Sequence, residues 1–262
     1  MPFLAREGSE LYYEVHGDGP ALIFAHGAGG NHLSWWQQIP YFRRRYCCVT
    51  FAHRGFAPST EAPGGPGREG FVDDLAALID YLDLSNVCLI AQSMGGWTAL
   101  GYSLRFPTRV RALVMASTTG GVAPLISDEE VARLRAGKPT REELLARGIL
   151  AGHERMMEEQ PALYHLYRSI TSWRDARLAE PRALALGRSP IPPEALSSLT
   201  MPVLALAGEE DTLALPPSLR ALAERVPNGR YASVPRAGHS VYFERPEAFN
   251  RIVDEFLTSV EA

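Results

Sequence analysis

The sequence predicts an α/β fold: a doubly wound, mostly parallel sheet with helices on both faces and a helical cap inserted before the last strands. Over the first 121 residues, short apolar runs alternate with amphipathic helical stretches. Such alternation is typical of parallel strands joined by right-handed crossovers. It stops near residue 122 and resumes near residue 200, so we expect residues 1–121 and 200–262 to form the core and residues 122–199 the cap.

Most of the expected strands are short apolar runs, as found in sheets that are covered on both faces. In chain order the strands span residues 11–15, 21–25, 46–52, 87–90, 110–115, 203–207 and 230–234. The expected core helices span residues 31–41, 71–82, 97–105, 217–225 and 246–260. Leu75, Leu78 and Leu82 lie on one stripe of the second of these helices, which predicts a face in contact with the sheet.

The cap is expected to be helical because its segment contains no convincing buried strand. Amphipathic helical stretches cover residues 129–136, 141–159 and 162–173 instead. An insertion at this point of an open α/β sheet lies over the carboxyl ends of the strands, where such sheets bind ligands. We therefore expect the functional site between core and cap.

The composition favours a small-molecule partner. The 262 residues are 46% apolar with a formal net charge of −4, and no Lys/Arg cluster is interleaved with aromatics, so neither nucleic acid nor a membrane is expected as a partner. The first residues lack a signal-peptide pattern and no apolar run could span a bilayer, which makes the cytoplasm the expected compartment. Cys47, Cys48 and Cys88 lie in apolar runs, so buried thiols are expected rather than disulfides. The oligomeric state is left open.

The most informative motif is a candidate nucleophile elbow, Ala91-Gln92-Ser93-Met94-Gly95-Gly96, which follows the strand at residues 87–90. An elbow holds a serine on a sharp turn from strand to helix, so small residues must flank it. Gly95 and Gly96 meet this need, while Ala91 replaces the usual first glycine. The alternative interpretation is a buried serine that caps the following helix.

A serine nucleophile needs a histidine base and an orienting carboxylate, in the chain order serine, acid, histidine for this architecture. Of the seven histidines, only His239 lies beyond the resumed strands. Three carboxylates, Glu209, Glu210 and Asp211, compete for the acid position after the strand at 203–207. We favour Asp211, at the fourth position after the last apolar residue of that strand, and interpret the two glutamates as solvated loop charges.

Two backbone amides are candidates for an oxyanion hole, which needs preorganised donors. The Met94 N–H follows the candidate nucleophile at a helix N-terminus, and the Ala28 N–H lies in the glycine-rich turn after the strand at 21–25. His26, at the end of that strand, is interpreted as a hydrogen-bonded structural residue rather than as a second base.

Together, five motifs in order resemble the α/β-hydrolase superfamily across nearly the whole chain. They are residues 26–30, 51–56, 93–96, 208–211 and 238–239. The resemblance implies Ser93 as nucleophile, Asp211 as acid, His239 as base and a helical cap over the site. One departure besides Ala91 is Ala52, where relatives commonly carry an aspartate, so Arg54 is expected to lose a partner there.

The residues also narrow the reaction. Epoxide hydrolases and dehalogenases of this superfamily carry an aspartate nucleophile, which Ser93 excludes, and carbon–carbon bond hydrolases usually carry a Gly-Pro-Gly oxyanion turn, which Ala28-Gly29-Gly30 does not match. Hydrolysis of an ester, lactone or related acyl bond of a small molecule through an acyl-Ser93 intermediate is therefore expected. Carbon–carbon bond hydrolysis, or a weakly catalytic small-molecule binding protein or receptor, are the alternatives.

No cofactor or metal is expected. The stretch Gly27-Ala28-Gly29 lacks the third glycine of a dinucleotide fingerprint, and His32 takes its place. The histidines are scattered without metal-ligand spacing. Several apolar side chains are candidates for substrate contact, although a side chain of this kind is more often packed in the core than in contact with substrate. They are Trp35, Trp97, Met157, Tyr164 and Tyr167, with Met156 and Trp173 as further candidates.

Overall fold

The computed structural model of the chain describes residues 2–146, 154–172 and 190–261. An eight-stranded sheet has the order β1-β2-β4-β3-β5-β6-β7-β8. The first two strands pair antiparallel, as do β2 and β4, and all other neighbours are parallel. The strands are β1 (Phe3–Arg6), β2 (Ser9–His16), β3 (Ala21–Ala25), β4 (Cys47–Phe51), β5 (Val87–Gln92), β6 (Val110–Ala116), β7 (Val203–Gly208) and β8 (Gly229–Val234).

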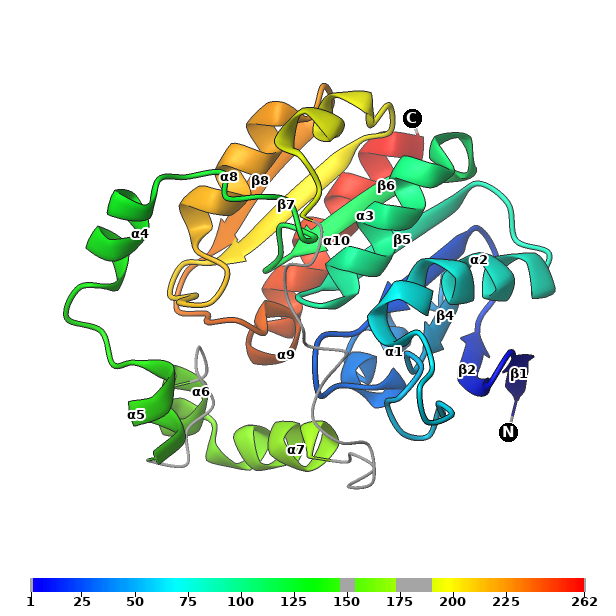
Figure 1. Cartoon of the computed structure of the whole chain (residues 1–262), viewed down its shortest axis with the longest axis horizontal. Helices are drawn as coiled ribbons and strands as arrows, with labels where there is room; N and C mark the ends of the chain where they lie inside the picture. Colours follow the sequence, from blue (N-terminus) through cyan, green and yellow to red (C-terminus); the bar gives the residue numbers. More distant parts are fainter. Residues whose placement is uncertain (1, 147–153, 173–189, 262) are drawn as a thin grey trace.

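Helices cover both faces of the sheet, which confirms the predicted doubly wound architecture (Figure 1). The core helices are α1 (Ile39–Phe42), α2 (Phe71–Tyr81), α3 (Gly95–Arg105), α8 (Pro216–Arg225), α9 (Val241–Glu244) and α10 (Pro246–Glu261). Short 3-10 helices are η1 (His32–Trp35), η2 (Gly67–Gly70), η3 (Pro107–Arg109) and η5 (Pro193–Ser198).

Alternate residues of the central strands feed two separate core clusters. In β3, Ile23 and Ala25 join side chains of α2, α3 and α8 on one face, while Leu22 and Phe24 join side chains of α1 and α10 on the other. All five residues of β3 are buried. This explains why the strand reads as a continuous apolar run rather than as an alternating one.

The observed elements differ from the predicted ones in two places. The predicted helix over residues 31–41 is divided into η1 and α1, because Pro40 has no N–H to donate and is tolerated only in the first turn of a helix. The short elements β1 and α9 are absent from the prediction. Four-residue elements carry too few positions for a periodic pattern to be recognised.

Four described α-helices come between β6 and β7 in the sequence. In space they lie on the side of the sheet toward which the arrow of β7 points (Figure 1). They are α4 (Asp128–Arg135), α5 (Arg141–Ala146), α6 (Glu154–Glu159) and α7 (Pro161–Thr171). The single helical stretch expected over residues 141–159 is thus represented by α5 and α6. The boundaries 122 and 199 of the cap stay a prediction.

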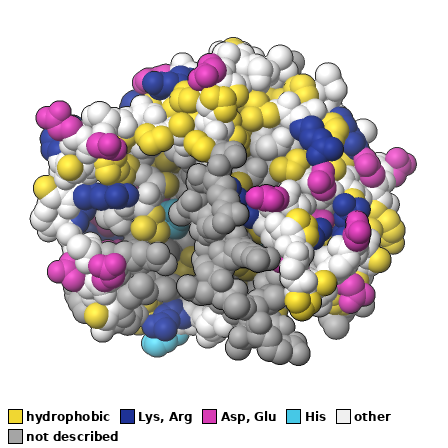
Figure 2. Space-filling view, viewed as in Figure 1, with side chains coloured by type: hydrophobic (Ala, Val, Ile, Leu, Met, Phe, Trp, Pro, Cys, Tyr) yellow, Lys and Arg dark blue, Asp and Glu magenta, His cyan; other side chains and the backbone are white. Residues whose placement is uncertain are grey.

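The charges on the surface are mixed in sign. Figure 2 shows acidic and basic side chains interspersed over the described part of one face. Among the helices that the structure describes, none has both the length and the apolar character to span a bilayer.

Candidate active site

Ser93 lies on a strained turn between β5 and α3. Its φ of 50° is in the left-handed region, where a non-glycine residue is uncommon. A Cβ on Gly95 would lie less than 3.0 Å from the Ala25 carbonyl oxygen, and one on Gly96 would lie equally close to Thr118 Oγ1. Ala91 itself is fully buried in the core cluster of α2, α3 and α8. These glycines are therefore needed for close approach, whereas a methyl group is accepted at position 91.

A continuous hydrogen-bond chain joins the three residues expected to form a triad. His239 Nε2 lies 2.9 Å from Ser93 Oγ, and His239 Nδ1 lies 2.9 Å from Asp211 Oδ2. Asp211 and His239 are buried, while Ser93 is partly exposed. The serine hydroxyl thus points at a histidine instead of capping α3, whose N-cap residue Met94 makes no side-chain cap bond.

Asp211 is fixed by its own loop. Its Oδ1 accepts the N–H of Leu213 at 2.8 Å and that of Ala214 at 3.0 Å. An acceptor-only carboxylate opposite Nδ1 requires that nitrogen to carry the proton, so Nε2 is left as the acceptor for the Ser93 hydroxyl. This is the tautomer that a general base needs.

The other two candidate acids lie elsewhere. Glu209 accepts a hydrogen bond from Ser233 Oγ at 3.0 Å. Glu210 forms a bidentate ion pair with Arg155 of α6, at 2.6 Å to Nε and 2.5 Å to Nη2. The expectation that Glu210 is merely solvated is wrong, because it ties the acid loop to the inserted helices.

The pKa of His239 reflects two opposed effects. Burial lowers it, but the charge of Asp211, the hydrogen bond to that carboxylate and the charge of Glu244 raise it more. The net result is a pKa raised above the usual value of histidine.

The glycine-rich turn after β3 lies against the elbow. A Cβ on Gly27 would meet Gln92 Oε1 and would lie 3.2 Å from Ser93 Cβ. Ala28, the next residue, is exposed, and Met94 is buried directly after Ser93. The two backbone amides considered for an oxyanion hole therefore belong to segments that adjoin the serine.

His26 has the structural role expected of it. Its Nδ1 donates to the Gly27 carbonyl at 2.8 Å, and its Nε2 accepts the backbone N–H of His53 at 2.9 Å. The His53 ring bonds the same nitrogen of His26 at 2.9 Å and Thr98 Oγ1 at 2.9 Å. This buried chain connects the turn after β3, the loop after β4 and α3, so it supports the floor of the site.

Acid should destabilise this buried pair. Burial lowers the pKa of His26 to about 4, and burial followed by the proximity of His26 lowers that of His53 well below its usual value. Both rings stay neutral in the folded state, while the unfolded chain takes up protons below about pH 6.5. We expect the free energy of unfolding to fall by about 1.4 kcal/mol per pH unit for each ring between about pH 6.5 and the folded pKa.

Urea unfolding at about pH 7 and about pH 5.5 measures this loss. His53→Asn should lower the stability at both pH values but reduce its dependence on pH. His165→Asn, at an exposed position of α7, should keep the wild-type dependence. An unchanged pH dependence in the His53 variant would contradict the assignment.

Arg54 keeps a partner despite Ala52. Its Nε and Nη2 each lie 2.5 Å from a carboxylate oxygen of Asp74, on α2, and both side chains are buried. The expected loss of a partner is therefore wrong. Asp74, on α2, is the carboxylate that binds Arg54 in this chain.

Three of the side chains assigned to substrate contacts are core residues. Trp35 is fully buried between Phe24 and Tyr242. The prediction that it contacts substrate is therefore corrected: it is a core residue. Tyr164 and Tyr167 of α7 are buried in the same cluster. The Tyr167 hydroxyl lies 3.0 Å from the Oγ of Ser240, the residue after His239. This contact was not predicted from the sequence.

The remaining candidates differ in exposure. Met157 is 39% exposed, whereas the neighbouring Met156 is fully buried and belongs to the core. Trp97 is half-buried, packs near Met94 and is covered by the Arg68 guanidinium at 4.5 Å. It keeps a position beside the elbow. Trp173 lies outside the described residues.

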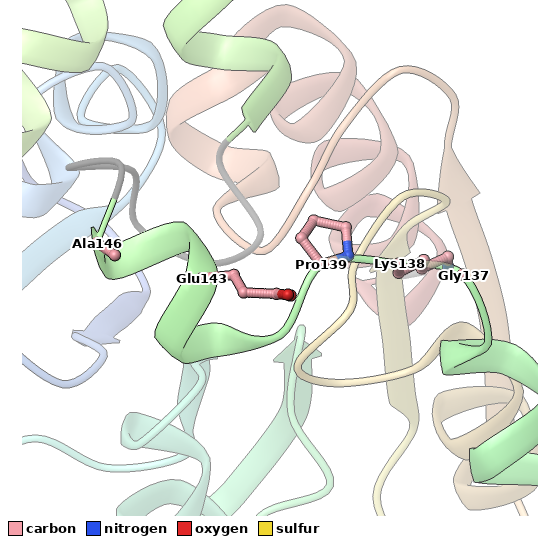
Figure 3. A pocket seen from close by; sticks show the side chains of 5 residues that line it. All are labelled: Gly137, Lys138, Pro139, Glu143 and Ala146. Carbon is pink, nitrogen blue, oxygen red and sulfur yellow. The ribbon is translucent and has the colours of Figure 1, made fainter.

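A cavity of about 730 Å³ lies at the segment between α4 and α5 (Figure 3). Its lining residues are Gly137, Lys138, Pro139, Glu143 and Ala146, none of which belongs to the Ser93 site. Within the described ranges, no group of three or more His, Cys, Asp or Glu side chains is arranged to hold a metal ion.

Comparisons with known proteins identify the fold family. A family model described as alpha/beta hydrolase fold matches residues 20–246. The chain is 27% identical to 3-oxoadipate enol-lactonase 2 of Acinetobacter baylyi, over 97% of this chain and 95% of the relative.

Two solved structures are similar over nearly their whole length. A thermophilic esterase from Thermogutta terrifontis has a TM-score of 0.80 and 27% identity, covering 97% of this chain and 95% of its own. Est816, described as an N-acyl homoserine lactone degrading enzyme, has a TM-score of 0.77 and 25% identity, covering 97% of this chain and 100% of its own.

Proposed function

Because this chain belongs to the alpha/beta hydrolase fold family, we propose that it is a serine hydrolase that cleaves a carboxylic ester, lactone or related acyl bond of a small molecule. The observation that carries the proposal is the hydrogen-bond chain from Ser93 Oγ through His239 to Asp211. A partly exposed hydroxyl that faces a buried base is the arrangement that activates a serine.

In the proposed reaction, Ser93 Oγ attacks the carbonyl carbon as its proton passes to His239 Nε2. The tetrahedral intermediate collapses when the bond to the leaving oxygen breaks, and His239 returns the proton to that oxygen. Water then attacks the acyl-Ser93 ester as its proton passes to His239 Nε2. The bond between the acyl carbon and Ser93 Oγ breaks, and His239 returns the proton to Ser93 Oγ as the acid product leaves. Asp211 holds the ring and stabilises the imidazolium in both halves of the reaction.

The negative oxygen of each tetrahedral intermediate needs donors that are already in place. We assign this role to the backbone N–H groups of Ala28 and Met94. The close approach of Gly27 to Ser93 and the position of Met94 directly after the nucleophile support this assignment. Each such donor is worth about 3 kcal/mol of transition-state stabilisation.

Esters and lactones are preferred over carbon–carbon bonds for two reasons. The turn that carries Ala28 is Ala28-Gly29-Gly30 instead of Gly-Pro-Gly. In addition, the similar proteins include an enol-lactonase and an esterase. No cofactor is assigned, since His239 mediates every proton transfer of the proposed reaction and Asp211 orients its ring. Beyond the small-molecule substrate no partner is proposed, and we place the protein in the cytoplasm.

A serine-directed fluorophosphonate tests the proposal together with an activated short-chain ester. We expect stoichiometric labelling at Ser93 and turnover of the ester. Absence of labelling at Ser93 would refute the hydrolase function. Labelling without turnover would favour a small-molecule binding protein that keeps a reactive serine.

The pH dependence of ester hydrolysis should report His239. The base must be neutral to accept the Ser93 proton, and its pKa is raised, so kcat/KM should rise with pH to a midpoint above about 6.5. Steady-state kinetics between about pH 5 and about pH 9 measure this limb. A profile that is flat across this range would contradict a histidine base.

A further inference from the structure

The loop that carries His239 is bound by a buried carboxylate outside the triad. Glu244, the last residue of α9, is 1% exposed. Its Oε2 accepts the N–H of Gly238 at 2.9 Å, and its Oε1 accepts the N–H of Ser240 at 3.1 Å. Each oxygen therefore bonds the backbone on one side of His239.

A second side chain, at the end of β5, donates a hydrogen bond to the same loop. Gln92 Nε2, at the residue before Ser93, donates to the His239 carbonyl oxygen at 3.1 Å. The three consecutive residues 238–240 are thus bonded at two N–H groups by Glu244 and at one carbonyl by the elbow. Such bonding fixes the distance between His239 and Ser93.

Among the described residues, no ion pair within 4.0 Å accounts for the burial of Glu244. In the part of the chain that the structure describes, no Lys or Arg nitrogen lies within 4.0 Å of its carboxylate. Arg245 directs Nη2 to Glu159 and Nη1 to the backbone carbonyl of Glu244. An isosteric glutamine would offer one acceptor and turn its NH₂ toward the other N–H, so only a carboxylate satisfies both donors.

We infer that Glu244 is a positioning residue for the general base, which holds His239 against Ser93 and stabilises the imidazolium by its charge. This inference rests on the proposed function. It accounts for a charged residue at a position where burial alone would favour a neutral one.

The electrostatics of the site agree with this role. Charged or titratable groups that face Glu244 are Asp211 and His239 from the neighbouring loops, Arg245 and Tyr242 from its own segment, and Tyr167 from α7. Burial raises the pKa of Glu244 to about 7, against the two N–H bonds and the charge of Arg245, which lower it. The charge of Glu244 in turn helps to raise the pKa of His239.

Glu244→Gln tests the inference, with Glu247→Gln as matched control. Glu247 is exposed, three residues further along the chain, and its substitution makes the same change of side chain. We expect Glu244→Gln to lower kcat and the rate of fluorophosphonate labelling about 10-fold or more, with KM nearly unchanged. The ascending limb of kcat/KM should also move to lower pH. The control should keep the wild-type rate and limb.

Glu244→Asp separates charge from position. It keeps the negative charge but shortens the side chain, so we expect slower labelling with an ascending limb near that of the wild type. This variant also decides the question if Glu244→Gln does not fold.

A Glu244→Gln protein with wild-type rate and limb but a lower melting temperature would overturn the inference and assign Glu244 to stability alone. A Glu244→Asp protein that labels at the wild-type rate would overturn it as well. If the wild type itself is not labelled, the proposed function fails instead.

Discussion

Replacing Ser93 by alanine should remove acyl-enzyme formation and lower kcat about 10⁶-fold while the fold stays intact. The substitution removes only the hydroxyl group of a partly exposed residue, so it leaves no large cavity in the core. Alanine also has a Cβ, so the strain at a φ of 50° is the same for both residues. Mass spectrometry after fluorophosphonate treatment, with ester kinetics, measures the effect.

Ser197→Ala is a matched control for this experiment. Ser197 is exposed in η5, and its hydroxyl donates to the Glu194 backbone carbonyl within its own turn. Its variant should be labelled like the wild type. Ester turnover by Ser93→Ala at a rate near the wild type would refute the nucleophile assignment.

Replacing Asp211 by asparagine should lower kcat about 10⁴-fold. The amide can present an NH₂ group to His239 Nδ1, which favours the tautomer that carries its proton on Nε2 and can no longer accept from Ser93. The backbone bonds from Leu213 and Ala214 can be kept by the amide oxygen, so the loop should retain its shape.

The adjacent Glu210→Gln provides the comparison. It removes the charge that pairs with Arg155, and because both side chains are partly exposed, solvent screens the pair and only a small effect is expected. We expect kcat to change by less than about 3-fold. Equal losses in the two variants, measured by the same ester kinetics, would mean that the wrong carboxylate was chosen.

Much of the core was predictable because burial on both faces leaves a strong local signal. β3, α2, β7 and α10 begin and end within one or two residues of their predicted bounds. The candidate triad was equally accessible, since chain order and position after a strand left one eligible histidine and three carboxylates. Short elements such as β1 and α9 carry no comparable signal.

The sequence by itself determined the layered α/β core and the identity of Ser93, Asp211 and His239 as a candidate set, because strand periodicity and glycine requirements are local. Only the tertiary structure decided which side chains meet across long separations. It paired Arg54 with Asp74, placed Trp35 in the core and brought the Glu244 carboxylate to both sides of His239. Such contacts depend on how distant elements pack together, which no local pattern of residues specifies.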